Sequence, residues 1–183
     1  ETVYAMLSGH FSGAVSIEPE PHNFSLLSEN IAANGLGSRV QAVNCAAGAK
    51  AGTAFLARSE SNKGGHALSV DAGGADRIAV EVLPVDSILA NLGIEASEAG
   101  LVWIDVNGTE QDVLSGMTSL LRHKVPVVLE HLPTFITADQ ARSIHRLLAA
   151  HYRHYCRVDD VDREPADIVR MDPLKDTGDF LFF

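Results

Sequence analysis

The sequence predicts an α/β fold built on a Rossmann-like, mostly parallel sheet, and three observations lead to this prediction. Strand-length apolar runs alternate with amphipathic helical patterns through most of the 183 residues, which is typical of parallel sheets covered by helices on both faces. Several of these runs end on a carboxylate or an amide. The last two apolar segments have no helix between them. This predicts that the carboxyl-terminal part of the chain forms an antiparallel hairpin at one edge of the sheet.

Residues 101–121 form the clearest strand-and-helix unit. Leu101–Ile104 is an unbroken apolar run, too short for a helix and rich in branched and aromatic residues, so it predicts a buried strand. Asp105 ends the run and an Asn-Gly pair two residues later predicts a turn. From Glu110 onward apolar residues recur at helical spacing, so one helix is predicted up to Leu121.

The amino-terminal part of the chain is expected to alternate in the same way. Prolines and an Asn-Gly pair mark where its elements start or stop. The predicted elements are a first helix with Val3, Met6 and Leu7 on one face, a strand at 14–17 that ends at Glu18, a helix from His22 that ends before Asn34-Gly35, and strands at 40–44 and 52–57.

The remaining elements follow a polar, Gly-rich segment, residues 58–76, which is expected to form a mobile excursion and could serve as a lid through residues near His66. Asp86 is the expected N-cap of the next helix. The predicted elements are a strand at 77–83, a helix at 87–92, a strand at 125–130, a helix capped by Thr137 or Asp139 that reaches His151, and strands at 155–158, 168–169 and 179–183.

Composition limits the classes of function. The length fits a single domain over residues 1–183, and no apolar run approaches a transmembrane helix. The formal net charge of -10 argues against nucleic acid or an anionic membrane as the main partner. Cys45 and Cys156 are expected to be reduced thiols of a cytoplasmic protein. The histidines lack ligand-type spacing to carboxylates, so no catalytic metal is expected.

Three segments in order resemble the FkbM-type methyltransferase family, which depends on S-adenosylmethionine. Ser16–Pro21, followed by Phe24, Leu27, Asn30 and Asn34, is similar to the family's "EP-x-P, then F, L, N and N" pattern. Residues 104–116 are similar to its "iDv(E/Q)GxE…vlxGa" signature, and 127–130 to its "p.i..E" strand. Asp86 stands where the family has a "tLD.l" element. The resemblance spans nearly the whole chain and departs at Asn107, where Glu or Gln is common.

The resemblance implies a class I methyltransferase sheet that uses S-adenosylmethionine as cofactor. It also implies that the family's first strand and glycine-rich loop precede Glu1, so both are expected to be missing from the chain as given. A shortened chain would explain this, and so would a degenerate, non-catalytic relative.

Four residues are predicted to contact the cofactor. Glu18 could accept hydrogen bonds from both ribose hydroxyls, and Pro19 could offer a flat apolar contact to the adenine. Asn44 could meet the adenine edge, and Asp105 could orient the cofactor's amino group. Each also has a structural interpretation: Glu18 as a surface residue before a proline turn, Asn44 as a turn residue, and Asp105 as a turn-stabilising or helix-capping carboxylate.

The predicted catalytic residues are Asp105, Glu130 and His131. The two strand ends are expected to face one pocket, in which Asp105 would orient the acceptor hydroxyl. His131 is a candidate base because imidazole titrates near neutrality. A histidine after a strand is, however, more often a hydrogen-bonded structural residue. Glu110 at the helix start is expected to be structural, complementing the helix dipole.

The sequence thus predicts a methyltransferase that transfers a methyl group from S-adenosylmethionine to a hydroxyl of a small metabolite or sugar. A second interpretation is a catalytically inactive Rossmann-like binding module. A third is an NAD-dependent dehydrogenase, since an acidic residue after the second strand also serves NAD. A missing central strand would favour association with another copy, so a homo-oligomer is possible. The acceptor's identity is not encoded in any readable motif.

Overall fold

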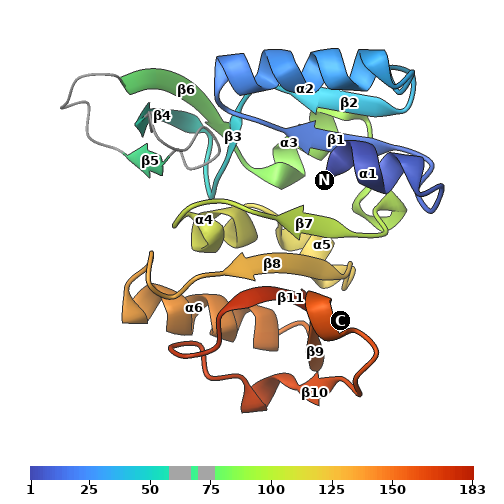
Figure 1. Ribbon diagram of the computed structural model, residues 1–183. Helices are drawn as coiled ribbons and strands as arrows, with labels where there is room; N and C mark the ends of the chain where they lie inside the picture. The colour runs from blue at the N-terminus through green and yellow to red at the C-terminus, as the bar shows by residue number, and fades with distance from the viewer. Residues whose placement is uncertain (58–66, 70–76) are drawn as a thin grey trace. The chain divides into compact units, whose positions relative to one another are not determined.

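A computed structural model describes residues 1–57, 67–69 and 77–183 of the chain (Figure 1). Their contacts divide into two compact units. Unit 1 comprises residues 1–47 and 51–83, and unit 2 comprises residues 48–50 and 84–183. Each unit is described by itself below, and the expectation of a single domain over 1–183 stays a prediction.

Unit 1 contains a parallel strand–helix–strand element. Strand β1 (Ala14–Ile17) pairs in parallel with β2 (Val40–Val43), with Ile17 opposite Val43. Helix α2 (Pro21–Ala33) connects them, and α1 (Thr2–Leu7) precedes them (Figure 1). The core of this part consists of Met6, Ile31, Leu36 and Val40. The predicted alternation of strand and helix is confirmed here.

Helix α2 begins one residue earlier than the sequence predicted. Glu20 is its N-cap: Oε2 of this nearly fully buried side chain accepts a hydrogen bond from the Asn23 backbone N–H at 2.7 Å. Pro21 then occupies the first helical position, where its missing N–H costs nothing. The sequence prediction took the two prolines only as a stop signal for β1.

The second sheet of unit 1 is mixed. Strand β3 (Ala46–Ala47) runs parallel to β6 (Arg77–Leu83), whereas β4 (Gly52–Ala57) is antiparallel to both β6 and β5 (Ala67–Ser69). The expectation of a mostly parallel sheet is therefore wrong for this part. Most of the predicted excursion, including the candidate lid at His66, lies outside the described residues. The exception is β5, which is a strand.

Unit 2 is built on a five-stranded sheet in the order β10-β9-β11-β8-β7. Strands β7 and β8 are parallel, and all other pairs are antiparallel. Figure 1 shows β8 between β7 and β11, with α6 running alongside. The strands are β7 (Val102–Ile104), β8 (Val127–His131), β9 (His154–Arg157), β10 (Ala166–Asp167) and β11 (Gly178–Phe182).

The antiparallel carboxyl-terminal part is confirmed, but its position differs from the prediction. Strand β11 lies inside the sheet, with Phe180 opposite both Leu129 and Arg157. The edge hairpin is instead β9–β10. Burying an apolar strand on both sides avoids an exposed hydrophobic edge, and Phe180 and Phe182 are accordingly buried. The expected strand at 168–169 is a 3-10 turn.

The predicted single helix over 110–121 is two helices. Helix α4 (Glu110–Ser115) and α5 (Thr118–Arg122) are separated at Gly116. A Cβ atom at Gly116 would lie only 2.0 Å from the carbonyl oxygen of Gly48, also in unit 2. The helix is interrupted at the point where the backbone of Gly48 packs closely against it. This contact joins residues far apart in the chain, so helical spacing could not predict it.

Asp86 is not the N-cap that the sequence predicted. Helix α3 (Val85–Leu92) begins after Pro84, which places Asp86 in its first turn. The Asp86 carboxylate instead accepts hydrogen bonds from the Ser119 backbone N–H at 3.0 Å and from the Thr118 hydroxyl at 2.9 Å. It therefore stabilises the start of α5, 33 residues further along the chain.

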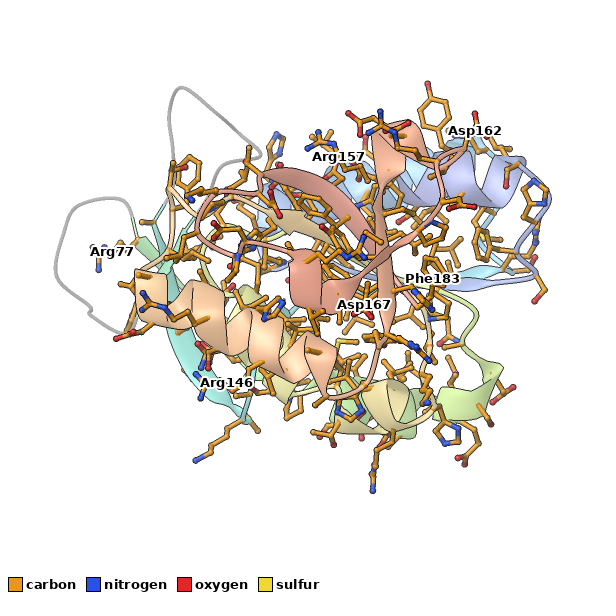
Figure 2. The ribbon with its side chains drawn as sticks, turned by 90° about the horizontal axis from the view of Figure 1, so that it is seen from below. Arg77, Arg146, Arg157, Asp162, Asp167 and Phe183 are labelled. Atoms are coloured by element: carbon orange, nitrogen blue, oxygen red, sulfur yellow. The ribbon has the colours of Figure 1, made fainter. Side chains whose placement is uncertain are left out.

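Helix α6 (Ala138–Ala149) starts as predicted. Thr137 and Gln140 form a reciprocal capping box, and Ala141, Ile144 and Leu148 face the core. Figure 2 shows the same helix from below, with Arg146 labelled on it. In the part of the chain that the structure describes, no helix combines the length and apolar character needed to cross a bilayer.

Candidate active site

Three carboxyl groups form a row across adjacent strands of unit 2. Asp179 on β11 pairs directly with Glu130 on β8. On the other side, Ile104 pairs with Leu129, so Asp105 stands level with Glu130 one residue beyond the β7–β8 ladder. Paired residues on neighbouring strands point to the same face of a sheet. The sequence predicted Asp105 and Glu130 as neighbours, and the register places them so.

Glu130 is the middle and most perturbed member of this row. Partial burial, the charge of Asp105 and a hydrogen bond with its carboxyl group raise the pKa of Glu130 to about 7. Asp179 and Glu110 raise this pKa further. Like charges this close cannot all ionise easily, so the Glu130 carboxyl gains and loses its proton near neutrality. Such a carboxyl group is suited to accept a proton at physiological pH.

The turn that follows Asp105 is hydrogen-bonded to the first residue of α4. Gly108 adopts a positive φ of 83°, which favours glycine, and its backbone N–H donates to Glu110 Oε1 at 2.9 Å. Glu110 is only 5% exposed. Burial raises the pKa of Glu110, while backbone N–H donors, including that of Gly108, and the charge of His131 oppose this rise. Glu110 therefore accepts a hydrogen bond that closes the turn before α4, in addition to the predicted interaction with the helix dipole.

His131 is placed differently from Glu130. The two residues are consecutive on β8, so their side chains point to opposite faces of the strand. His131 is 1% exposed, and its Nε2 lies 3.0 Å from the Pro173 carbonyl oxygen. This arrangement is that of a hydrogen-bonded structural histidine. Its role as general base stays a prediction, and Glu130, which is partly exposed, is better placed for that role.

The predicted adenosine-binding residues cluster at the end of β1 in unit 1. Glu18 Oε1 accepts a hydrogen bond from the Glu20 backbone N–H at 2.8 Å. Asn44 Nδ2 donates to the carbonyl oxygens of Glu18 and Pro19, at 2.8 and 3.2 Å. Both Asn44 amide hydrogens are thereby used. These hydrogen bonds fit the turn interpretation, and contact of Asn44 with an adenine through its side-chain oxygen stays a prediction.

The structure therefore brings the predicted residues together in two sets, one within each unit. Glu18, Pro19 and Asn44 contact one another in unit 1, and Asp105 and Glu130 do so in unit 2. Asp179 was missed, although an acidic residue opening the last apolar strand was a usable signal. Among residues 1–57, 67–69 and 77–183 no three His, Cys, Asp or Glu side chains are grouped to hold a metal.

Polar residues at the carboxyl ends of parallel strands β1, β2, β7 and β8 define an α/β protein of the kind that binds ligands beyond its strand ends. The model of the methyltransferase FkbM domain family matches residues 2–156. The chain belongs to this family, as the sequence motifs predicted.

A solved structure, the methyltransferase FkbM from Methylobacillus flagellatus KT, has a similar fold. Its TM-score is 0.59 at 16% sequence identity, and the match covers 99% of this chain and 39% of that one. The chain thus spans well under half the length of this relative. The mixed α/β fold matches, although the sheets are not a single parallel Rossmann sheet. The comparison with curated proteins finds no match.

Proposed function

We propose that the protein is an S-adenosylmethionine-dependent methyltransferase that methylates a hydroxyl group of a small metabolite or sugar. Membership of the methyltransferase family supports the reaction class and disfavours the dehydrogenase alternative. The observation that carries the choice of oxygen as acceptor is the Asp105–Glu130 pair, because a hydroxyl must lose its proton as it is methylated. Glu130, with its pKa raised to about 7, can take that proton at neutral pH.

Glu18 is the proposed ribose ligand. An ionised carboxylate can accept hydrogen bonds from both ribose hydroxyls, and the Glu20 backbone N–H donates to Glu18 Oε1 at 2.8 Å. That same bond, together with the Asn44 contacts to the neighbouring carbonyls, fixes the turn in advance. Pro19 adds an apolar surface for the base. A preorganised turn reduces the entropy lost when a ligand binds.

Asp105 and Glu130 are the proposed catalytic residues. S-adenosylmethionine, when bound, would supply a methyl group on a positively charged sulfur, and the sulfur would keep the electron pair of the broken bond. Asp105 orients the acceptor hydroxyl, whose oxygen forms the new bond to the methyl carbon. The hydroxyl proton passes to the carboxyl pair, on Glu130, and is later released to water. Because the displacement is in-line, positioning provides much of the rate.

Calorimetric titration of S-adenosylmethionine and S-adenosylhomocysteine into the full-length protein tests this proposal. We expect binding of both, weakened about tenfold or more in Glu18→Gln, since one charged hydrogen-bond acceptor is worth roughly 1.5–3 kcal/mol. Absence of binding by the unsubstituted protein would overturn it. Binding without formation of S-adenosylhomocysteine from any panel of sugars and hydroxylated metabolites would favour the non-catalytic binding module instead.

A further inference from the structure

An exposed tryptophan lies on the same face of the unit 2 sheet as the proposed catalytic pair. Trp103 is the middle residue of β7, and it is 46% exposed. The next residue, Ile104, is only 3% exposed, whereas Asp105 after it is exposed again. Side chains alternate between the two faces of a sheet along a strand. Trp103 and Asp105 therefore share one face, and Ile104 lies on the opposite, buried face.

The strand register extends this face across three strands. Trp103 of β7 pairs with Val128 of β8, which pairs in turn with Leu181 of β11. These three residues form an apolar row. Two positions away along each chain segment is a second row, the acidic row, formed by Asp105, Glu130 and Asp179. Residues two apart on a strand are separated by about 6.6 Å, so the two rows lie side by side.

This face is accessible along both rows. The acidic row points to one side of the sheet, because Asp105 and Glu130 share a hydrogen bond. Asp105 and Asp179 are exposed, and Glu130 is partly exposed. Within the apolar row, Trp103 is the exposed member. The described part of unit 2 thus presents an aromatic surface next to three carboxyl groups.

A sugar ring matches both kinds of surface. A pyranose carries C–H groups on its faces and hydroxyl groups around its rim. The C–H groups can pack on the flat apolar surface of an indole, and the hydroxyl groups can donate hydrogen bonds to carboxylate oxygens. An open-chain polyol has the hydroxyl groups but no fixed apolar face, and a hydrocarbon ring has the face without the donors. A ring-shaped polyhydroxylated molecule therefore uses the two rows together.

We propose that the acceptor is a sugar ring that stacks on Trp103 while its hydroxyl groups donate hydrogen bonds to the acidic row. Trp103 is then a specificity-determining residue, which selects a cyclic sugar over an open-chain or purely apolar hydroxyl compound. The stacked ring places a rim hydroxyl beside Asp105 and Glu130, the proposed catalytic pair. Methylation of that hydroxyl rests on the proposed function, whereas binding of the sugar ring does not.

Tryptophan fluorescence tests the stacking without a cofactor. Trp103 is the only tryptophan of the 183 residues, and the difference from Trp103→Phe isolates its signal in the full-length protein. We expect the emission of a solvent-exposed indole in the free protein, and a saturable change on titration with methyl glucopyranoside, galactopyranoside or mannopyranoside. The dissociation constant for at least one of them should be about tenfold or more below that for sorbitol, an open-chain polyol.

The same measurement can overturn the proposal. A Trp103 indole that is already shielded from acrylamide quenching in the free protein would show that another part of the protein covers this face. No response to any of the three pyranosides would exclude stacking of a sugar ring, and so would a response equal to that for sorbitol.

Calorimetry of the same pyranosides with variants separates stacking from a structural role. Trp103→Ala should weaken binding about tenfold or more, and Trp103→Phe, which retains a ring, should recover part of this loss. Trp103→Leu retains apolar volume without an aromatic face, so it decides if Trp103→Ala does not fold. Full binding by Trp103→Leu would contradict the proposal. Tyr4→Ala is the control, since it removes an exposed aromatic side chain of unit 1 and should leave binding unchanged.

Methyl-transfer kinetics distinguish this inference from the proposed function. With a pyranoside as acceptor, Trp103→Leu should raise the KM for the acceptor about tenfold and leave kcat nearly unchanged, because the indole contacts the acceptor and not the reacting atoms. Sugar binding without any methyl transfer would contradict the proposed function and leave the sugar site in place. Methyl transfer to open-chain acceptors at rates that Trp103→Leu does not alter would overturn the sugar site and leave the proposed function in place.

Discussion

The carboxyl groups that follow β1 in unit 1 and those of the Asp105, Glu130 and Asp179 row in unit 2 have opposite kinds of neighbour. In unit 1, Glu18 and Glu20 each accept a hydrogen bond from a backbone N–H, at 2.8 and 2.7 Å. In unit 2, the charges that act on Glu130 come from three other carboxyl groups, those of Asp105, Asp179 and Glu110. Backbone donors favour the ionised form of a carboxyl group, while neighbouring carboxylates favour the protonated form.

Under the proposed function, this difference separates ligand binding by Glu18 from proton transfer by Glu130. A carboxylate that is fixed by a backbone N–H, as Glu18 is, suits the role of accepting hydrogen bonds from ribose hydroxyls. A carboxyl group raised to a pKa of about 7 can both take and release a proton near neutrality. Replacing each carboxyl by its amide should therefore have different consequences in the two units.

The largest expected effect is the loss of methyl transfer in Glu130→Gln. The amide cannot accept the hydroxyl proton, so the rate should fall about 10²–10⁴-fold, the usual contribution of a general base. In the unsubstituted protein the rate should rise with pH to a plateau above about pH 7, since the base must be ionised. Steady-state kinetics across pH 5–9 measures both the rate and its dependence on pH.

Glu164→Gln is the control, because Glu164 is an exposed glutamate of unit 2. It should change neither the rate nor its pH dependence. An unchanged rate in Glu130→Gln would show that Glu130 is not the general base.

The next effect concerns stability in unit 1. Glu20→Ala removes the N-cap of α2 and leaves the Asn23 N–H without its acceptor, so the free energy of unfolding should fall by about 1–2 kcal/mol. Glu20→Gln keeps an acceptor oxygen and should lose less. Urea denaturation of the two variants provides the comparison. If both variants lose the same amount, the side-chain charge and not the cap is responsible.

Stability in unit 2 should depend on pH in the opposite sense to an ordinary carboxylate. Burial and neighbouring carboxyl groups raise the Glu130 pKa from 4.5 to about 7. Between these values the folded state binds more protons than the unfolded state, so this group's contribution to stability is complete below about pH 4.5 and is lost as pH rises through about 7. Glu130→Gln should therefore unfold less readily than the unsubstituted protein at pH 8, with a smaller difference at pH 5. Thermal unfolding at both pH values tests the sign.

The smallest effect should come from Asp179→Asn. Its charge raises the Glu130 pKa, but less than the charge and hydrogen bond of Asp105 do. The midpoint of the activity profile should shift downward slightly in Asp179→Asn, with the maximal rate nearly unchanged. ¹³C-carboxyl titration of Glu130 in this variant measures the shift directly. An upward shift would show that Asp179 acts through structure and not through its charge.

Local sequence patterns were sufficient to predict the elements in unit 1 that end on Glu18 and Asn44, because apolar spacing and proline position set them. They were also sufficient for Asp105 and Glu130, since both end short apolar strands. The position of β11 between β8 and β9 was not predictable, because strand order depends on which edges need covering.

Three further features depended on residues far apart in the chain. Asp86 stabilises a helix 33 residues away, Gly116 is fixed by the backbone of Gly48, and the burial of Glu110 follows from the placement of α4. Helical spacing and capping preferences describe neighbours within a few residues. They therefore placed Asp86 and Glu110 in local roles and extended one helix across Gly116.

The approach of Gly116 to Gly48 has a consequence for dividing the molecule. Residues 48–50 belong to unit 2, although the chain on both sides of them belongs to unit 1. A protease cut or a gene split between Leu83 and Pro84 would therefore not release two self-sufficient pieces. The carboxyl-terminal fragment would lack residues 48–50, against which Gly116 packs between α4 and α5. It would therefore need this segment to be supplied by the other fragment.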